Sequence, residues 1–459
     1  MVTLPGYVGG GSASIGSDAF DTIPGGVQGV KTNGTVRVLA GTYPLPVVVT
    51  RTMHLVGDGS SSTFIQGAGS GTGVVVRRPG DGVTIDGFTI RDFGLGVYLD
   101  GRTANHIDGF QFVNNALINN ATGAITATFV DKGYFADNEI YAGSGYGIDL
   151  YNGNTPSFIG NRFHDIGGFG LRTRSTTGAL ISHNSLQNLG WNGIVAGDSS
   201  SNTSVVSNII DTTNLTLSGL GFNEGGIVLY NTTNSVVEYN KVSGVGTAGG
   251  SNDTAGLWIG GSDSGSTASY NQFLNNVNDG VLLWAFNVGA PPVLHCNHIY
   301  GNGRFGIRNQ VAAPPIVDAT GNWWGRNTPT TGTSAPRDIY RPPVNVDYDP
   351  RIRVLLAPSA PTVLAGGPSI VITATACGGG CCMLDGMPIT LTTSLGQLGT
   401  PPGPVAVSAL NGGWTIVAFK PGTVAGTAVI TGYVANHGVV TTSVRRSSPI
   451  CAALAGTRA

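Results

Sequence analysis

Charged residues are scarce in this 459-residue chain: lysine, arginine, aspartate and glutamate together make up 10%, and the formal net charge is −2. A protein that binds nucleic acid needs clustered lysine and arginine, and the sequence contains no such cluster. No segment approaches the roughly 18 continuous apolar residues of a membrane-spanning helix. The sequence therefore predicts neither a nucleic-acid partner nor a membrane-spanning segment.

A signal peptide is also lacking, because the segment from Met1 to Gly6 has neither a basic start nor an apolar core. The turns are polar and rich in serine, threonine and asparagine, which is typical of exported proteins. We therefore expect an extracellular or cell-surface protein in a mature or truncated form.

Cysteine is rare, and its pattern does not suggest a metal site. The segment Cys377-Gly-Gly-Gly-Cys381-Cys382 lacks the C-x₂-C pairs and histidine partners of zinc sites. We expect no metal and no cofactor. One or two disulfides are expected among Cys377, Cys381, Cys382 and Cys451, with a free, buried thiol at Cys296.

Glycine, in contrast, is abundant, with 73 residues, and it recurs with asparagine at a fixed spacing. Asn138, Asn161 and Asn184 follow one another at intervals of 23 residues, and a glycine stands nine residues after each. A period of this size predicts stacked supersecondary units, and alternating apolar residues within each unit predict strands. Because so short a unit can bury its apolar side only against its neighbours, the sequence predicts a parallel β-helix.

The repeat extends in both directions, from Asn114 to Asn322. Asparagine and glycine best tolerate a left-handed backbone in tight turns. A buried asparagine can also bond to the asparagine of the next coil. The expected ladder consists of Asn138, Asn161, Asn184, Asn208, Asn240, Asn271 and Asn297.

Two coils break this spacing. Asn208 lies 18 residues before Gly226, and Asn240 lies 16 residues before Gly256. The inserts, residues 211–224 and 243–255, fall in the same turn of successive coils and should project side by side. Insertions on one face of a repeat protein often carry binding.

The strand that follows each repeat glycine alternates inward and outward residues. This alternation predicts an exposed aromatic cluster beside the two inserts, on a surface suited to sugars or to a protein partner. The predicted binding surface consists of Tyr230, Trp258, Trp284, Glu224 and Asp253. Asp149 and Arg172 face each other across one rung and are interpreted as a structural ion pair.

The pattern changes near Asp349, where a proline-rich link begins. Short alternating strands separated by glycine and proline turns follow from residue 362 and predict a β-sandwich. The fold class is therefore all-β: a parallel β-helix of about eleven coils, followed by a small sandwich.

Two resemblances refine this prediction. Gly41-Thr-Tyr43 near the start, the Asn/Gly repeat, and Asn322-Trp-Trp-Gly325 at its end resemble right-handed β-helix proteins of the pectate-lyase-like and nitrous-oxide-accessory type. Leu391-Thr-Thr-Ser-Leu-Gly396 and Gly412-Gly-Trp414 resemble bacterial immunoglobulin-like domains of the invasin/intimin type, which are usually spacers or adhesive modules. The expected domains are a cap region (1–34), the β-helix (35–348), the link (349–361) and an immunoglobulin-like sandwich (362–459).

Enzymes on this fold need clustered catalytic groups. A lyase requires acidic residues around Ca²⁺ and a base, and a glycosidase requires two carboxylates about 5–9.5 Å apart. The outward columns offer only Asp149 beside Arg172 and Arg174, and the Asp-Asp and Gly-His-Gly signatures implied by resemblance to polygalacturonases are missing. The inserts and the residues near them add five scattered carboxylates: Asp211, Glu224, Asp253, Asp263 and Asp279.

We therefore expect a non-enzymatic structural or adhesive protein of a bacterial surface or fibre. It would act by head-to-tail self-association or by contact with a surface or glycan. The alternative is a carbohydrate-active enzyme, either a polysaccharide lyase or a glycosidase, or a glycan-binding module. That alternative would use the groove beside residues 211–224 and 243–255.

Overall fold

The computed structural model describes residues 19–213, 224–247, 253–286, 290–310, 316–340, 346–434 and 437–448. Within them the chain forms a short helix, α1 (Ile23–Gly29), and the strands β1 to β49. None of the helices in this part of the chain is long and apolar enough to cross a membrane. The fold is all-β, as predicted.

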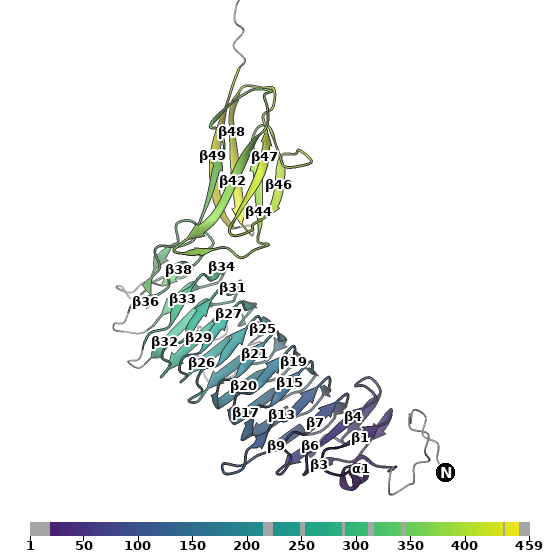
Figure 1. Ribbon diagram of the computed structural model, residues 1–459. Helices are drawn as coiled ribbons and strands as arrows, with labels where there is room; N and C mark the ends of the chain where they lie inside the picture. The colour runs from purple at the N-terminus through teal and green to yellow at the C-terminus, as the bar shows by residue number, and fades with distance from the viewer. Residues whose placement is uncertain are drawn as a thin grey trace, which may run out of the picture. The chain divides into compact units, whose positions relative to one another are not determined.

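Three long parallel sheets form the β-helix, and Figure 1 shows the strands of successive coils stacked beside one another. The first sheet is, in hydrogen-bonding order, β1 (Gly34–Val38), β4 (Met53–Gly57), β7 (Thr84–Asp86), β11 (Gln111–Val113), β15 (Tyr134–Ala136), β18 (Ser157–Ile159), β21 (Leu180–Ser182), β24 (Ser204–Val206), β27 (Val236–Glu238), β30 (Thr267–Ser269), β33 (Val293–His295), β36 (Val317–Asp318) and β39 (Val346–Asp347). The second is β2 (Gly41–Tyr43), β5 (Thr63–Gln66), β8 (Thr89–Arg91), β12 (Ala116–Ile118), β16 (Glu139–Tyr141), β19 (Arg162–Ile166), β22 (Ser185–Leu189), β25 (Ile209–Thr213), β28 (Lys241–Ser243), β31 (Gln272–Leu274) and β34 (His298–Tyr300).

The third sheet is β3 (Val47–Val49), β6 (Thr72–Arg77), β9 (Leu95–Asp100), β13 (Gly123–Thr128), β17 (Tyr146–Asn154), β20 (Leu171–Thr177), β23 (Ile194–Gly197), β26 (Glu224–Tyr230), β29 (Thr254–Gly261), β32 (Asp279–Phe286), β35 (Phe305–Asn309), β38 (Arg337–Tyr340) and β37 (Thr331–Gly332). A short pair, β10 (Ile107–Asp108) and β14 (Val130–Asp131), adds to the coils beside it. Each coil passes through the three sheets in turn, which explains the 23-residue period.

Identical positions of successive coils stack inside the β-helix. Phe112, Phe135 and Phe158 are paired in register on β11, β15 and β18, and all three are fully buried. The rings of Phe135 and Phe158 lie 5.0 Å apart and nearly parallel. Such stacking removes one face of each coil from water and is the main stabilising contribution of a repeat fold.

The repeat asparagines form a buried hydrogen-bonded ladder. Asn184 donates its backbone N–H and its Nδ2 to Oδ1 of Asn208, both at 2.9 Å, and Nδ2 also bonds the carbonyl of Phe158. The same pattern links Asn115, Asn138, Asn161, Asn184, Asn208, Asn240 and Asn271, and again Asn297 and Asn322.

The left-handed corner residue is the one before each ladder asparagine, not the asparagine itself. His183, Tyr239 and Cys296 have φ of 57°, 56° and 58°. In the first coil of the ladder this corner position is Asn114, so Asn115 is the ladder residue there, one position later than the sequence spacing suggested. The corner bends the chain from the first sheet to the second and directs its own side chain out of the coil.

Helix α1 closes the described start of the β-helix. The side chain of Thr22 accepts the N–H of Gly25 at 3.2 Å and caps the first turn. Ile23 and Val27 are buried, and the helix contacts β1 and β3. A helix in this position covers the apolar interior of the first described coil.

The chain divides into two compact units: residues 1–293, 301–317 and 332–345, and residues 294–300, 318–331 and 346–459. Most of the second unit is a β-sandwich. One of its sheets consists of β40 (Arg353–Pro358), β42 (Ile370–Gly378), β47 (Trp414–Lys420), β45 (Gln397–Leu398) and β43 (Cys381–Cys382). The other consists of β41 (Thr362–Leu364), β49 (His437–Ser447), β48 (Gly426–Val434), β44 (Pro388–Thr393) and β46 (Val405–Ala409). Alternate residues such as Ile372, Leu391 and Ile430 are fully buried and form its core.

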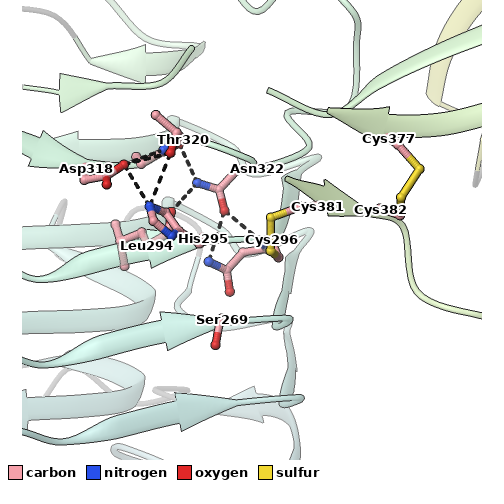
Figure 2. The surroundings of a disulfide bond; sticks show 12 residues. Ser269, Leu294, His295, Cys296, Asp318, Thr320, Asn322, Cys377, Cys381 and Cys382 are labelled. Atoms are coloured by element: carbon pink, nitrogen blue, oxygen red, sulfur yellow. Dashed lines mark hydrogen bonds and ion pairs between the residues drawn. A yellow bond between two sulfur atoms is a disulfide. The ribbon is translucent and has the colours of Figure 1, made fainter. Parts of the chain in front are cut away.

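Two disulfides lie within the second unit (Figure 2). Cys377 pairs with Cys382, and Cys296 pairs with Cys381, with Cα atoms 5.3 Å apart in the second bond. The predicted disulfides at Cys377, Cys381 and Cys382 are present, but the prediction of a free Cys296 is wrong. Cys296 is a corner residue with a positive φ, and its side chain points out of the coil towards Cys381. Cys451 lies outside the described residues.

His298 is fully buried in β34 of the second unit. Neither ring nitrogen has a hydrogen-bond partner among the described residues, and burial lowers the pKa of His298 to about 4 from an ordinary 6.5. Between these values the unfolded chain binds a proton that the folded chain does not, so stability falls as the pH decreases from 6.5 towards 4.

We expect His298→Leu to remove most of this pH dependence. The wild type should lose about 2–3 kcal/mol of unfolding free energy between pH 7.5 and pH 4.5 through this one group, and the variant should not. Denaturant unfolding at the two pH values measures the difference. His54→Leu, at an exposed position in β4, is the matched control. Equal pH dependence in wild type and His298→Leu would contradict the burial of the neutral imidazole.

Candidate functional site

The outer face of the third sheet carries the predicted site residues. Along β17, Ile148 and Leu150 are fully buried in the coil, whereas Asp149 and Tyr151 face outward. The strand register extends one outward column through Asp149, Arg172, Val195, Val228, Trp258, Leu282 and Arg308. The predicted alternation of the strands is therefore present.

The predicted exposed aromatic cluster is not exposed. Trp258 is fully buried in an apolar cluster on this outer face, together with Val228, Ala255 and Leu282. Tyr230 and Trp284 are half-buried and pack against that cluster. Period-2 alternation predicted the side of the sheet correctly but not the burial, because the outward neighbours of Trp258 on the adjacent strands, Val228 and Leu282, are apolar and pack against it.

Both inserts enter the third sheet beside this cluster. One joins β25 to β26 and the other joins β28 to β29, and these strands are neighbours in their sheets. The inserts therefore occupy the same turn of successive coils, as predicted. Residues 214–223 and 248–252, in the middle of the inserts, lie outside the described residues.

A charged group lies at the edge of the sheet where the inserts enter. Arg308 of β35 donates Nε to Asp279 at 2.5 Å and Nη2 to Asp253 at 3.0 Å. Asp279 is fully buried and Arg308 nearly so, whereas the side chain of Asp253 is 24% exposed. Because both bonds end on one planar guanidinium, the two bonded carboxylate oxygens lie within about 8 Å of each other.

Burial dominates the electrostatics of this group. It raises the pKa of Asp279 to about 6, against the opposing effect of Arg308, which favours the ionised carboxylate. Asp279 also accepts the backbone N–H of Phe305 at 3.2 Å. Asp279 therefore holds Arg308 from the buried side, and Asp253 is the carboxylate of this group that is in contact with solvent.

Further polar residues continue this edge. Glu224 begins β26, is buried, and stands opposite Thr254 of β29. Asn278 donates its amide to the hydroxyl of Thr254 at 2.6 Å. Hydrogen-bonding side chains therefore stand next to an apolar, aromatic-rich cluster, a composition that is common in ligand-binding sites.

A second charged group lies on the same face, three to six rungs away. Arg172 donates hydrogen bonds from Nε and Nη2 to the carboxylate of Asp149, at 3.1 and 2.7 Å. Arg174 donates hydrogen bonds from its own Nε and Nη2 to the same carboxylate, at 3.3 and 2.9 Å. We call Asp149, Arg172 and Arg174 the Asp149 clamp. The predicted ion pair of Asp149 and Arg172 is present, and the structure adds Arg174 to it.

Aromatic rings border the Asp149 clamp. Tyr146 and Phe169 stack with centroids 5.1 Å apart, and Trp191 follows 6.5 Å from Phe169. The guanidinium of Arg172 lies 4.3 Å from the centroid of Phe169, and that of Arg174 lies 5.3 Å from the centroid of Tyr151. Trp191 and Tyr151 are 40% and 39% exposed, so this part of the face is open to solvent.

The remaining acidic residues near the inserts do not join these groups. Asp211 accepts the hydroxyl of Ser243 on the second sheet. Asp263 is buried in the turn after β29, where it accepts the hydroxyls of Thr232 and Ser266, and burial raises its pKa to about 6. Among the residues that the structure describes, no three His, Cys, Asp or Glu side chains are grouped to hold a metal ion.

The contacts of Arg308 with Asp279 and Asp253 were not predicted from the sequence. Arg308 stood in the outward column, and Asp279 preceded a repeat glycine, so both positions were visible in the repeat. Their contact was not, because Asp279 lies directly opposite Phe305, and Arg308 reaches it only diagonally across β35.

Comparison with known proteins supports the fold. Residues 72–220, less than half of the chain, match the family model described as a right-handed beta helix region. An α-1,3-glucanase of family GH87 from Streptomyces thermodiastaticus matches with a TM-score of 0.54 and 13% identity, over 70% of this chain and 63% of its own length. With the parallel sheets, these findings establish a right-handed parallel β-helix.

Two other solved structures match more loosely. The A-module of a mannuronan C-5 epimerase from Azotobacter vinelandii has a TM-score of 0.41 and 16% identity, over 70% of this chain and 90% of its own. The enzymatically active domain of tailspike protein 2 from bacteriophage CBA120 has a TM-score of 0.46 and 9% identity, over 94% of this chain and 75% of its own. No curated protein matches the sequence.

These comparisons contradict the expectation that the chain is not an enzyme. The solved structure that matches with a TM-score of 0.54 is named as the catalytic unit of a glucanase. The expectation rested on missing motifs of a few known families, and the absence of those motifs does not exclude other catalytic arrangements on the same fold. At these identities the likeness establishes the fold, and the activity must be argued from the site.

Proposed function

We propose that this chain is a carbohydrate-active enzyme that holds a glycan along the outer face of the third sheet. The observation that carries the proposal is the group of Asp253, Arg308 and Asp279 at the edge where both inserts enter. A β-helix does not need buried charge on the outside of a sheet, and desolvating the charges of Asp279 and Arg308 is costly. Buried charged groups of this kind are concentrated at functional sites.

The chemistry of the group suits acid–base catalysis at a glycosidic bond. Glycosidases use two carboxyl groups whose different environments give them different pKa values and different roles. In our proposal the partly exposed carboxylate of Asp253 meets the substrate. Buried Asp279 acts through Arg308 as a positioning residue, because its bond to Nε fixes the guanidinium that orients Asp253.

The fold and the neighbouring side chains support this assignment. Tyr230 and Trp284 present half-buried rings on the same face, where a sugar ring can stack. The glucanase with a TM-score of 0.54 has the same fold, which is consistent with carbohydrate chemistry on such a sheet.

We expect Asp253→Asn to lower turnover by about 10²–10⁴-fold while leaving the fold intact. The wild type is first screened against neutral and acidic polysaccharides by reducing-end release and by absorbance of unsaturated products. The variant is then assayed on the best substrate. Asp108→Asn is the matched control, because Asp108 is an exposed partner of Lys132 in the pair of β10 and β14, several coils before Asp253. Full activity in Asp253→Asn, or no activity of the wild type on any polymer, would refute the proposal.

We also propose that the protein acts outside the cytoplasm. Its two disulfides support this location, because such bonds persist mainly in oxidising compartments. The sandwich is proposed to be an immunoglobulin-like module of the intimin type that serves as a spacer or an adhesive contact. The head-to-tail self-association expected from the sequence stays a prediction.

A further inference from the structure

We propose that the Asp149 clamp is a subsite for an acidic sugar, so that the glycan held on this face carries carboxylate groups. This inference rests on the proposed function, since it assumes that a glycan lies along the third sheet. It adds the class of the substrate and the residues that select it.

Unused hydrogen-bond donors are the first argument. Each guanidinium has five N–H donors. Arg172 and Arg174 each direct only Nε and Nη2 to Asp149. Among the described residues, neither Nη1 group has a hydrogen-bond partner, and the two side chains are 30% and 31% exposed. Two neighbouring arginines therefore present Nη1 donors to solvent.

Charge is the second argument. Two arginines and one aspartate give the Asp149 clamp a formal charge of +2 − 1 = +1, in a chain whose net charge is −2. One arginine would be enough to neutralise Asp149. The second leaves a positive charge that an anionic ligand can complement, and arginine is the side chain best suited to bind a carboxylate through two parallel hydrogen bonds.

Rigidity is the third argument. Asp149 is only 6% exposed and accepts four hydrogen bonds, which hold both guanidinium groups in place. Arg172 is also held over the ring of Phe169 and Arg174 over the ring of Tyr151. A ligand that binds here does not have to order two flexible arginine side chains, so less binding energy is lost to conformational entropy.

The exposed rings supply the remaining part of a sugar site. Tyr151 lies against Arg174, and Trp191 lies beside Phe169, the ring that Arg172 covers. Both exposed rings offer aromatic surface for the apolar face of a pyranose ring. Carboxylate recognition by the arginines, with stacking on these rings, fits an acidic polysaccharide better than a neutral one.

The test measures binding without turnover, with Asp253→Asn as the background. Polygalacturonate and its fully methyl-esterified form are compared as probes by affinity electrophoresis and titration calorimetry, with dextran sulfate as a third probe. We expect polygalacturonate to bind at least tenfold more tightly than the ester, with an affinity that falls as salt increases. Sulfate binding as tight as carboxylate binding would overturn the assignment to carboxylate.

Arg174→Gln and Arg172→Gln should each weaken polygalacturonate binding about tenfold or more and leave binding of the ester unchanged. Arg162→Gln is the control, because Arg162 is an exposed arginine on the second sheet that pairs with Glu139. Thermal melts establish that each variant is folded. Equal binding of the two polymers, or an Arg162→Gln effect as large as that of Arg174→Gln, would overturn the inference.

These outcomes separate the inference from the proposed function. Cleavage of a neutral polysaccharide that Asp253→Asn abolishes, with no preference for polygalacturonate, would retain the enzyme and reject the acidic subsite. Binding of polygalacturonate through Arg174, without turnover of any polymer by the wild type, would retain the subsite and reject the enzyme.

Discussion

Ile210→Asp should lower the free energy of unfolding by about 5 kcal/mol, enough to unfold much of the β-helix at ambient temperature. Ile210 lies in β25, is fully buried, and pairs in register with Leu186 and Val242 of the neighbouring coils. The substitution removes a buried apolar side chain and places a carboxyl group in an interior without a partner. Denaturant unfolding followed by circular dichroism measures the loss.

Ile209→Asp is the matched control for this prediction. Ile209 is the same residue type, adjacent on the same strand, but 55% exposed and next to Lys241 in the strand register. A carboxylate there stays in water and gains a basic neighbour, so the change in stability should be within about 0.5 kcal/mol. Similar losses in both variants would mean that β25 does not have the inward and outward alternation seen in the structure.

The coils could be predicted from the sequence because the determining interactions are local and repeated. Asn161 and Asn184 lie 23 residues apart in the chain and one strand spacing apart in space, so the same requirement recurs in every coil. Each coil needs an asparagine at the same position of the ladder, so the asparagine recurs at a fixed interval in the sequence. The direction of side chains along β17 and β20 follows in the same way from strand geometry.

Burial on the outer face could not be predicted in this way. Trp258 occupies an outward position by register, yet it is fully buried among Val228, Ala255 and Leu282. Alternation along a strand indicates which side of the sheet a residue faces, but not whether side chains of the adjacent strands cover it. The disulfide of Cys296 is a similar case, since its partner Cys381 lies 85 residues away in the sandwich.

The candidate site was only partly visible in the sequence for the same reason. Glu224 and Asp253 were placed near the inserts because the insert positions follow from the broken spacing. The bonds that join Asp253 to Arg308 and Arg308 to Asp279 depend on the length and direction of a single arginine side chain. Strand register places backbones beside one another but does not determine such diagonal contacts.

Asn184→Asp, which changes one nitrogen to oxygen within the ladder, should cost about 3–5 kcal/mol at neutral pH. Nδ2 of Asn184 donates to Oδ1 of Asn208 and to the carbonyl of Phe158, both at 2.9 Å. In the variant an oxygen faces these two acceptors in a buried site, so both lose their donor. The shape of the side chain hardly changes, which makes the hydrogen bonds, not packing, the cause of the loss.

The pH dependence of Asn184→Asp provides a second measurement. A protonated carboxyl can still donate one hydrogen bond, and burial beside two acceptors should raise its pKa above that of the unfolded chain. The destabilisation should therefore grow as the pH rises from 4 to 7. Asn152→Asp is the control, because Asn152 has a corner conformation with φ of 57° and its amide makes no hydrogen bond with the described residues. A loss at Asn152 that equals the loss at Asn184, or one at Asn184 that does not depend on pH, would show that the ladder bonds do not stabilise the coils.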